Sequence, residues 1–309
     1  MSILCVGSVA LDSVETPFGE ATRVLGGSAN FFAASASLFT SVQVVGVVGE
    51  DYPLEKLDFL RERGVDLSGI EERPGESFFW AGRYHYDLNS RDTLETRLGV
   101  FADFKPRIPE SFRSARHIFL GNIDPTLQLD VLNQVDDPGV VAADTMNYWI
   151  EGARTELLQL LERVDILLVN DAEARQLADE PNLLKAAEWI RGRGPSVVVI
   201  KKGEHGAMLF DGDAVFFAPG YPLEQVFDPT GAGDAFAGGF LGYLARRDRM
   251  DHETLRRAVV FGSATGSFAV EDFSIDRFRS LDMQQVVKRV REFREMTSFE
   301  APVREVLGV

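Results

Sequence analysis

Short apolar segments rich in β-branched residues recur along the chain, and segments with helical periodicity lie between them. Strands that are apolar along their whole length are typical of a parallel sheet covered by helices on both faces. The expected strands are residues 2–10, 42–49, 117–121, 139–144, 165–170 and 196–203. The expected helices are residues 53–63, 151–163, 182–193, 231–247, 251–268 and 282–296. The pattern predicts an α/β fold with a mostly parallel central sheet.

The composition narrows the class of protein. The 309 residues, 45% of them hydrophobic, can bury one large α/β core, and the formal net charge of −16 argues against a nucleic-acid-binding surface. The first residues read as a buried strand and not as a signal peptide, and no apolar run is long enough to cross a bilayer. The single cysteine, Cys5, is expected to be inert core, which suits a reducing compartment. We expect a cytoplasmic protein that binds neither nucleic acid nor membranes.

Residues 77–101 break the alternation of strands and helices. The segments 77–86 and 94–101 predict two antiparallel strands with aromatic side chains on one face. Two interpretations are open, a hairpin packed on the body or a small lid over a ligand pocket. The aromatic stripe, which includes Trp80, can stack on a nucleobase, or form lid core or a dimer seam. Arg83 and Arg91 are candidates for contacting an anionic substrate, although exposed arginines usually do nothing specific. The tail after Met296 is expected to be poorly packed.

Polar or glycine residues follow strand after strand, at the carboxyl ends where open parallel sheets bind ligands. They are Asp12, Asn122, Asp124, Asp144, Asn147, Asn170, Glu173, Lys201 and Gly203. Each one alone has a structural explanation, because Asp and Asn cap helices and shape turns. Their recurrence at one edge indicates a site.

The segment DPTGAGDAFAGG, residues 228–239, places glycines and a carboxylate at the start of an apolar helix. The amides of residues 231–233 can point together at developing negative charge, and Asp234 can take a proton from a hydroxyl. Together they suit transfer of a phosphoryl group to an alcohol. A P-loop motif is absent, and Phe236 occupies the third small position of a dinucleotide-binding fingerprint. Scattered histidines and the lack of a nucleophile elbow leave zinc and hydrolytic chemistry unsupported.

This segment resembles the C-terminal signature of the PfkB/ribokinase family of small-molecule kinases. Further features follow in the family's order over nearly the whole chain: Asp12, the diglycine Gly26-Gly27, VVGVVGEDY at 44–52, Asn170-x-x-Glu173 and Lys201-x-Gly203-x-x-Gly206. The resemblance implies a three-layer α/β/α sandwich that forms a single ribokinase-like kinase domain over residues 1–309. Its small β lid would be built mainly from residues 77–101, with part of residues 12–30.

The resemblance also implies roles for individual residues. Asp234 would deprotonate the acceptor hydroxyl, and the amides before it would form the anion hole. Those amides belong to Gly231, Ala232 and Gly233. Asn170 and Glu173 match a motif that organises nucleotide phosphates and Mg²⁺, the metal being held by Glu173 through water. The other implied nucleotide-binding residues are Lys201, Gly203, Gly206, Thr230, Gly262 and Ser263. The implied acceptor-binding residues, besides Asp234, are Asp12, Gly26, Gly27, Asn30, Phe31, Trp80, Asp144 and Asn147, the last two near the phosphate path.

The diglycine loop departs from the family's pattern. Sugar kinases of the family usually carry three residues between the diglycine and an acceptor-binding Asn, whereas GGSANFF has two before Asn30, so that an ungapped alignment places Phe31 there. A loop shorter by one residue would leave an ordinary sugar site. A replacement of the Asn by Phe31 would remove a hydrogen bond and favour a ligand with an apolar or planar part.

We therefore predict an ATP-dependent kinase that transfers the γ-phosphoryl group to a hydroxyl of a sugar, with a nucleoside as the alternative acceptor. A non-catalytic ligand-binding homologue and a nicotinamide dehydrogenase are further alternatives. The intact Asp234 with its glycines argues against the first, and the missing third glycine argues against the second. The family resemblance implies ATP and Mg²⁺, with a monovalent cation such as K⁺, and a homodimer formed through the lid.

Overall fold

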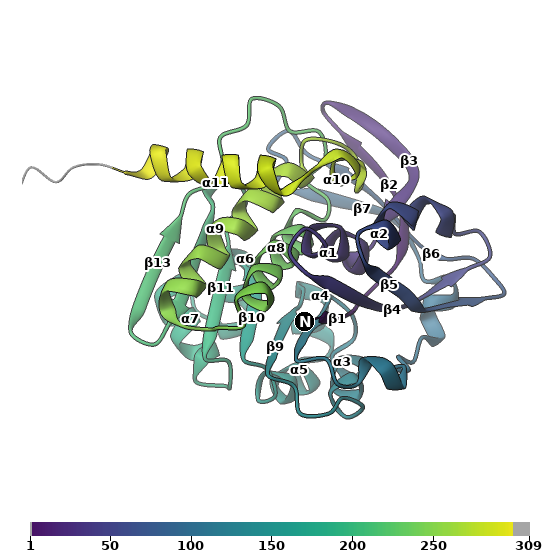
Figure 1. The fold of residues 1–309 in the computed structure, drawn as a ribbon, viewed down its shortest axis with the longest axis horizontal. Coiled ribbons are helices and arrows are strands. Elements are labelled where there is room, and N and C mark those ends of the chain that lie inside the picture. The colour runs from purple at the N-terminus through teal and green to yellow at the C-terminus, as the bar shows by residue number, and fades with distance from the viewer. Residues whose placement is uncertain (1, 299–309) are drawn as a thin grey trace, which may run out of the picture.

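The computed structural model describes residues 2–298, and its centre is a nine-stranded sheet (Figure 1). The strands lie in the order β13 (Ala214–Ala218), β12 (Ala207–Asp211), β11 (Val197–Lys201), β10 (Ile166–Asn170), β9 (Val140–Asp144), β8 (His117–Leu120), β1 (Ser2–Val6), β4 (Ser41–Gly49) and β5 (Val65–Arg73). From β11 to β5 every pair of neighbours is parallel, and β12 and β13 add an antiparallel hairpin at one edge. The predicted, mostly parallel central sheet is confirmed.

Helices cover both faces of this sheet. One layer consists of α1 (Ser28–Ala36), α2 (Asp58–Glu62), α8 (Ala232–Arg247), α9 (His252–Ala269), α10 (Asp276–Ser280) and α11 (Met283–Thr297). The other consists of α3 (Pro125–Leu132), α4 (Asn147–Gly152), α5 (Arg154–Leu161), α6 (Asp171–Ala178) and α7 (Leu183–Arg191). Short 3-10 helices complete the chain: η1 (Leu54–Leu57), η2 (Gly99–Asp103), η3 (Glu110–Phe112) and η4 (Gly203–His205).

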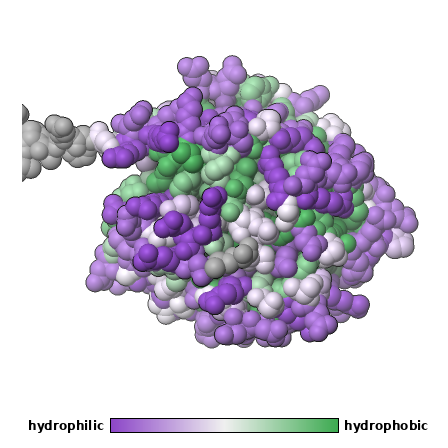
Figure 2. All heavy atoms as spheres, in the orientation of Figure 1, coloured by the Kyte–Doolittle hydropathy of each residue, from purple (hydrophilic) through white to green (hydrophobic). Residues whose placement is uncertain are grey.

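The alternation of side chains along β1 shows why two helical layers are needed. Ile3 and Cys5 pack in the core that contains α1, α8 and α9, whereas Leu4 and Val6 pack in the core on the opposite face. All four side chains are fully buried, because each successive residue of a strand points to the other face. Hydrophilic side chains cover most of the face shown in Figure 2, and hydrophobic ones show through between them. The predicted α/β/α sandwich is confirmed.

A second, four-stranded sheet lies beside this body, on the right of the view in Figure 1. Its order is β3 (Gly19–Gly26), β2 (Ala10–Thr16), β6 (Phe78–Tyr84) and β7 (Arg91–Arg97). The β2/β3 and β6/β7 pairs are antiparallel, and β2 pairs with β6 in parallel. This sheet is the lid. Residues that are far apart in the sequence build it together.

Several element boundaries differ from the sequence-based expectation. The strand expected over residues 2–10 ends at Val6, and the chain enters the lid at Ala10. The break occurs because Ser8 leaves the main sheet and exchanges hydrogen bonds with Ser28: each residue's N–H donates to the other's Oγ, at 3.1 and 3.0 Å. The helix expected over 151–163 divides at Ala153, and the one expected over 53–63 is a 3-10 turn followed by α2.

The chain end and membrane topology add two observations. Helix α11 continues past Met296 to Thr297, whereas residues 299–309 of the tail expected to be poorly packed lie outside the described residues. Between residues 2 and 298, no helix combines the length and the hydrophobicity that crossing a membrane requires.

Candidate active site

Three neighbouring parallel strands end in polar side chains at the same edge of the central sheet. β9 ends at Asp144, β10 at Asn170 and β11 at Lys201. Asn170 is the register partner of Lys201. The lysine reaches across the end of β10, and its Nζ donates to Asp144 Oδ2 at 2.6 Å. The polar strand ends that the sequence singled out here therefore meet in space.

Asn170 and Glu173 form a reciprocal cap at the start of α6. Asn170 Oδ1 accepts from the Glu173 N–H, and Glu173 Oε2 accepts from the Asn170 N–H, each at 2.8 Å. The N-x-x-E spacing is thus also that of a capping box, which fixes the glutamate at the edge of the sheet. Burial and the nearby Asp144 carboxylate raise the pKa of Glu173 to about 7, although the Lys201 charge opposes them.

The glycine-rich segment forms the start of α8. Gly231 is the N-cap, with φ 72°, and a Cβ there would lie 2.2 Å from the ring of Phe31. Only glycine fits both the left-handed backbone and the contact. The Ala232 N–H donates to Pro229 O at 3.3 Å, so this amide is partly engaged in the turn. Within residues 2–298, the amides of Gly231 and Gly233 have no acceptor, and these two are free for an anion.

Asp234 lies in the first turn of α8. Although part of its side chain reaches the surface, the surrounding protein desolvates the carboxylate and, together with the Asp144 charge, raises the pKa of Asp234 to about 7. Burial alone would lower the pKa of Lys201, but the carboxylates of Asp144, Glu173 and Asp234 hold it above its usual value. The lysine therefore stays charged, while Asp234 can exchange a proton near neutral pH.

A second group of polar residues lies where the diglycine meets the lid. Asp12, on β2, is buried, and the backbone N–H of Gly27 favours its charged form. A Cβ on Gly26 would lie 2.0 Å from Asp12 Oδ2, and Gly27 has φ 90°, so both positions need glycine. Burial, followed by the charges of Asp228 and Asp234, raises the pKa of Asp12 to about 8.

The structure shows how Asn30 and Phe31 of the GGSANFF loop are used. Asn30 Nδ2 donates to Gly26 O at 2.6 Å and to Tyr52 Oη at 2.7 Å, so Asn30 braces the diglycine loop. The ring of Phe31 lies instead under Gly231. Both side chains are buried. The sequence assigned no role to Tyr52, although it closes the VVGVVGEDY stretch.

Lid residues complete the group of side chains. Trp80 is the register partner of Asp12 across the β2/β6 pair, which places both side chains on the same face of the lid sheet. Trp80 Nε1 donates to Thr93 Oγ1 at 3.4 Å, and its ring lies across Gly82, where a Cβ would meet it at 2.2 Å. On the same face, the Tyr84 hydroxyl accepts from Thr230 Oγ1 at 3.2 Å. The lid thereby touches the glycine-rich segment directly.

Other predicted residues are exposed or serve the fold. Asn147 is exposed, at the start of α4, and its side chain makes no hydrogen bond within the described part of the chain. Asp124 caps α3, and Asn122 Oδ1 accepts from Trp149 Nε1 at 2.9 Å. Gly262 allows close packing of α9 on α8, since a Cβ would lie 2.8 Å from Phe236 O.

Three more predicted positions are Gly203, Gly206 and Ser263. Gly203 begins η4 and Gly206 follows it, with φ 56° and 91°, left-handed values that favour glycine. The Ser263 Oγ, in α9, is buried and has no hydrogen-bond partner among residues 2–298.

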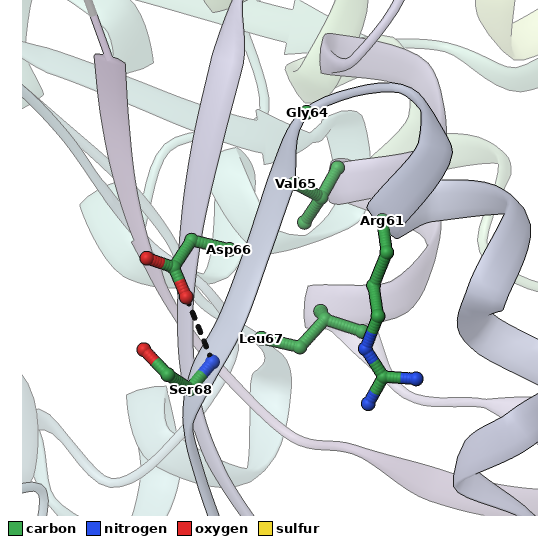
Figure 3. Close-up of a pocket in the computed structure, with 6 residues that line it drawn as sticks. All are labelled: Arg61, Gly64, Val65, Asp66, Leu67 and Ser68. Carbon is green, nitrogen blue, oxygen red and sulfur yellow. Dashed lines mark hydrogen bonds between the residues drawn. The ribbon is translucent and has the colours of Figure 1, made fainter.

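A shallow pocket also lies at the far edge of the main sheet, between α2 and β5 (Figure 3). It is lined by Arg61 and by residues 64–68, where Asp66 Oδ1 accepts from the Ser68 N–H at 2.9 Å. None of the residues described above lines it, so this pocket is not the candidate active site.

The donor set at the strand ends fits Mg²⁺ only in a particular way. Asp144, Glu173 and Asp234 surround Lys201, but no three His, Cys, Asp or Glu side chains between residues 2 and 298 are arranged to enclose a metal ion. Mg²⁺ prefers to keep several waters and to bind through substrate phosphates and one or two carboxylates. The site therefore fits a metal that Glu173 contacts through water.

A carboxylate that can exchange a proton, beside a glycine-rich helix start and near a lysine held by acids, suits transfer of a phosphoryl group to an alcohol. The comparisons agree. Residues 2–277 match the family model described as pfkB family carbohydrate kinase. The chain belongs to the pfkB family of carbohydrate kinases. It is an ATP-using enzyme that phosphorylates a hydroxyl group of a sugar-type acceptor, as the sequence predicted.

Individual relatives span nearly the whole chain. The chain is 32% identical over 251 residues to the cytidine kinase of Thermococcus kodakarensis, a match that covers 80% of this chain and 89% of that protein. It is 25% identical over 291 residues to the nucleoside kinase of Methanocaldococcus jannaschii, covering 87% and 90%. The crystal structure of aminoimidazole riboside kinase from Salmonella enterica has the same fold, with a TM-score of 0.75, 24% identity and coverage of 94% and 100%.

Proposed function

We propose that this kinase phosphorylates the ribose of a nucleoside. The observation that carries the proposal is the pairing of Asp12 with Trp80 on one face of the lid. A buried carboxylate suits sugar hydroxyls, and an aromatic ring beside it suits a planar base. The surrounding charges support a neutral acceptor. Asp12 lies near the negative charges of Asp228 and Asp234, which would repel an anionic acceptor. The names of the Thermococcus and Methanocaldococcus relatives also favour a nucleoside.

In the proposed mechanism, Asp234 removes the proton of the acceptor hydroxyl as its oxygen attacks the γ-phosphorus of ATP. A pKa of about 7 suits a general base near neutral pH. The free amides of Gly231 and Gly233 would donate to the transferred phosphoryl group, and Lys201, held by Asp144, would bind the nucleotide phosphates. Bound Mg²⁺, reached through water by Glu173, would neutralise phosphate charge.

The other implied residues would surround the same ligands. Thr230 and the turn of Gly203 and Gly206 would lie along the nucleotide, and the partnerless hydroxyl of Ser263 would face adenine beside Gly262. Gly26, Gly27 and Asn30 would shape the acceptor loop, with Phe31 supporting Gly231. Asn170 would position Glu173, and Asn147 would lie near the phosphate path.

The proposal extends to organisation and conditions. Residues 1–309 form one kinase domain, with the lid as part of it. A K⁺ requirement is supported by Asp228, the buried carboxylate that begins the glycine-rich segment. Burial raises the pKa of Asp228, and a cation bound there would stabilise its charged form. Turnover in K⁺ against tetramethylammonium salts tests it.

A homodimer through the lid is supported by exposed apolar side chains on the lid strands and turns, namely Phe18, Tyr86, Leu94 and Leu98. Light scattering of the wild type and of Leu94→Glu tests this assembly. A cytoplasmic location is supported by the buried, unpaired Cys5.

A free sugar is the second candidate acceptor. It is favoured by the way Trp80 is held, across Gly82 and bonded to Thr93, which leaves its ring less free to stack on a base. A coupled ADP-release screen over pentoses, hexoses and nucleosides decides between the two. Turnover with a nucleoside at a higher kcat/KM than any sugar supports the first proposal, and turnover with free sugars alone overturns it.

A further inference from the structure

A glutamine buried behind the strand ends contacts the backbone of two neighbouring strands. Gln128 lies in α3, and its side chain is fully buried. Its Nε2 donates to Gly121 O at 2.8 Å, to Asp144 O at 3.1 Å and to Leu120 O at 3.3 Å. One side-chain amide therefore holds three backbone carbonyls, which lie at or just beyond the ends of β8 and β9.

These hydrogen bonds lie where the pairing between the two strands stops. Leu120 and Ala143 are the last register partners of β8 and β9, and Asp144 comes next along β9. On its other side, Asp144 is still the register partner of Leu168 in β10. The position of Asp144 relative to β8 consequently depends on groups outside the β8/β9 pairing, and the Gln128 amide is such a group.

The donor is the part of the Gln128 side chain that this position uses. Its Oε1 is buried and has no hydrogen-bond partner among residues 2–298. A buried acceptor without a partner destabilises the folded state, and an apolar side chain of similar size would avoid that cost. Such a side chain would also leave the three carbonyls without the Nε2 donor. The glutamine therefore fits this place for what its nitrogen holds.

One of the three carbonyls belongs to the residue that fixes the lysine of the site. Asp144 Oδ1 accepts from the Thr145 N–H at 2.8 Å, and Asp144 Oδ2 accepts from Lys201 Nζ at 2.6 Å. Gln128 holds the carbonyl of the same residue, so the backbone and the carboxylate of Asp144 are both tethered. A shift of this backbone would move the carboxylate, and the lysine would move with its partner.

We propose that Gln128 is a positioning residue for phosphoryl transfer. By holding the carbonyl of Asp144, it keeps the Asp144 carboxylate, and through that carboxylate Lys201, at the place where the nucleotide phosphates bind. The side chain is enclosed by protein, so it acts through Asp144 and not on the substrates directly. The inference rests on the proposed role of Lys201 but not on which alcohol is the acceptor.

The test compares Gln128→Met with Gln134→Met. Gln134 is a matched control just after the same helix, and its Nε2 donates to Pro106 O at 2.9 Å and to Asp130 O at 3.2 Å, neither of which belongs to the candidate site. Methionine is similar in length to glutamine but has no N–H donor. Because small displacements of positioning groups are costly, Gln128→Met should lower kcat/KM for ATP by about ten- to a hundredfold. The KM of the acceptor should be unchanged, and Gln134→Met should behave like the wild type.

A double-mutant cycle separates positioning from a general loss of stability. If Gln128 acts through Asp144, then Gln128→Met should cost little further activity in the Asp144→Asn background, where the carboxylate is already gone. Urea denaturation identifies the variants that are folded under assay conditions. If Gln128→Met is unfolded, Gln128→Asn replaces it in every comparison, because its amide is one methylene shorter and draws back from the carbonyls.

The outcomes distinguish this inference from the mechanism on which it rests. Additive losses in the cycle, or wild-type kinetics for the folded Gln128 variant, would overturn the positioning role. An impaired Asp144→Asn enzyme beside an unimpaired Gln128 variant would overturn this role alone. An Asp144→Asn enzyme as active as the wild type would instead overturn the proposed role of the Asp144–Lys201 pair, and the positioning role with it.

Discussion

Lys201 Nζ donates to Asp144 Oδ2 at 2.6 Å, from one strand of the central sheet to another beyond the strand between them. The same ammonium would lie 3.0 Å from a Cβ placed on Gly233. The lysine is therefore fixed between an acid and Gly233, at the point where negative charge would collect. The residues around this lysine give the site a catalytic rate, a pH dependence and a stability that can each be measured.

Replacing Asp234 by Asn should remove the base while keeping the size of the side chain. We expect kcat to fall by about 10²- to 10⁴-fold, the usual contribution of general-base catalysis. ATP affinity measured by calorimetry should stay close to that of the wild type, because the lysine and amides are retained. An Asp234→Asn enzyme as active as the wild type would contradict the assignment of the base.

The pH dependence of kcat/KM should report the pKa of Asp234. Its folded-state pKa is raised to about 7, and a base works only when deprotonated, so the rate should rise with pH and level off above about 7. Asp144→Asn removes a charge that contributes to this rise, and the limb should move to lower pH. A profile that is flat between about pH 5 and 9 would show that another group takes the proton.

Asp12 should make the folded protein less stable as the pH rises. In the folded state it holds its proton up to about pH 8, whereas the ordinary value is 3.8. The folded state therefore binds the proton more tightly, and stability falls as the pH rises through that window. The Asp12→Asn variant has no proton to lose at this position, so the Tm of the variant minus that of the wild type should increase from about pH 5 to about pH 9 in thermal melts. The variant should also bind the acceptor less well. A constant difference would contradict the raised pKa.

Gly231 should tolerate no side chain. Alanine there would adopt a left-handed backbone at about 1–2 kcal/mol and overpack against Phe31 at about 1–3 kcal/mol more. Gly231→Ala should lower both the stability measured in urea and kcat. In a double-mutant cycle with Phe31→Leu, the two losses should be less than additive, since they share one contact. Strict additivity would mean that the ring and the loop do not interact.

Glu173 is expected to have two roles, one structural and one chemical, which different substitutions can separate. Glu173→Gln keeps a side-chain oxygen that can accept from the Asn170 N–H, so stability should change by less than about 0.5 kcal/mol. The loss of charge should raise the Mg²⁺ concentration needed for half-maximal activity. Glu173→Ala loses the cap as well, and should cost about 1 kcal/mol. An unchanged Mg²⁺ dependence in Glu173→Gln would remove the glutamate from the metal's surroundings.

The sequence predicts the fold well where strands are buried on both faces. β10 and β11 are apolar runs, and periodicity alone finds them within a residue or two. β5 and β7 lie at sheet edges, where polar side chains alternate with apolar ones in β5 and are continuous in most of β7. The apolar pattern therefore does not predict β5, and it places β7 a few residues too far along the chain. Helix α6 is short and depends on its cap, whose residues the sequence analysis considered both as helix caps and as nucleotide ligands without expecting a helix there.

The site is predictable in its chemistry and less so in its contacts. Motif spacing singles out Asp234, Lys201 and Glu173 without any structure. The pairing of Trp80 with Asp12 depends on a register between strands far apart in the chain, and no local pattern encodes it.

The lid is made from two separate excursions of the chain, residues 10–26 and 78–97, which join as neighbouring inner strands β2 and β6. Each excursion leaves the body and returns to it, so the lid is attached by four covalent connections. Acceptor preference consequently cannot be transplanted by exchanging one hairpin. An engineer, or evolution by recombination, would have to replace both segments together, and a hybrid carrying only one would present a foreign register at the very pair of strands that holds Asp12 and Trp80.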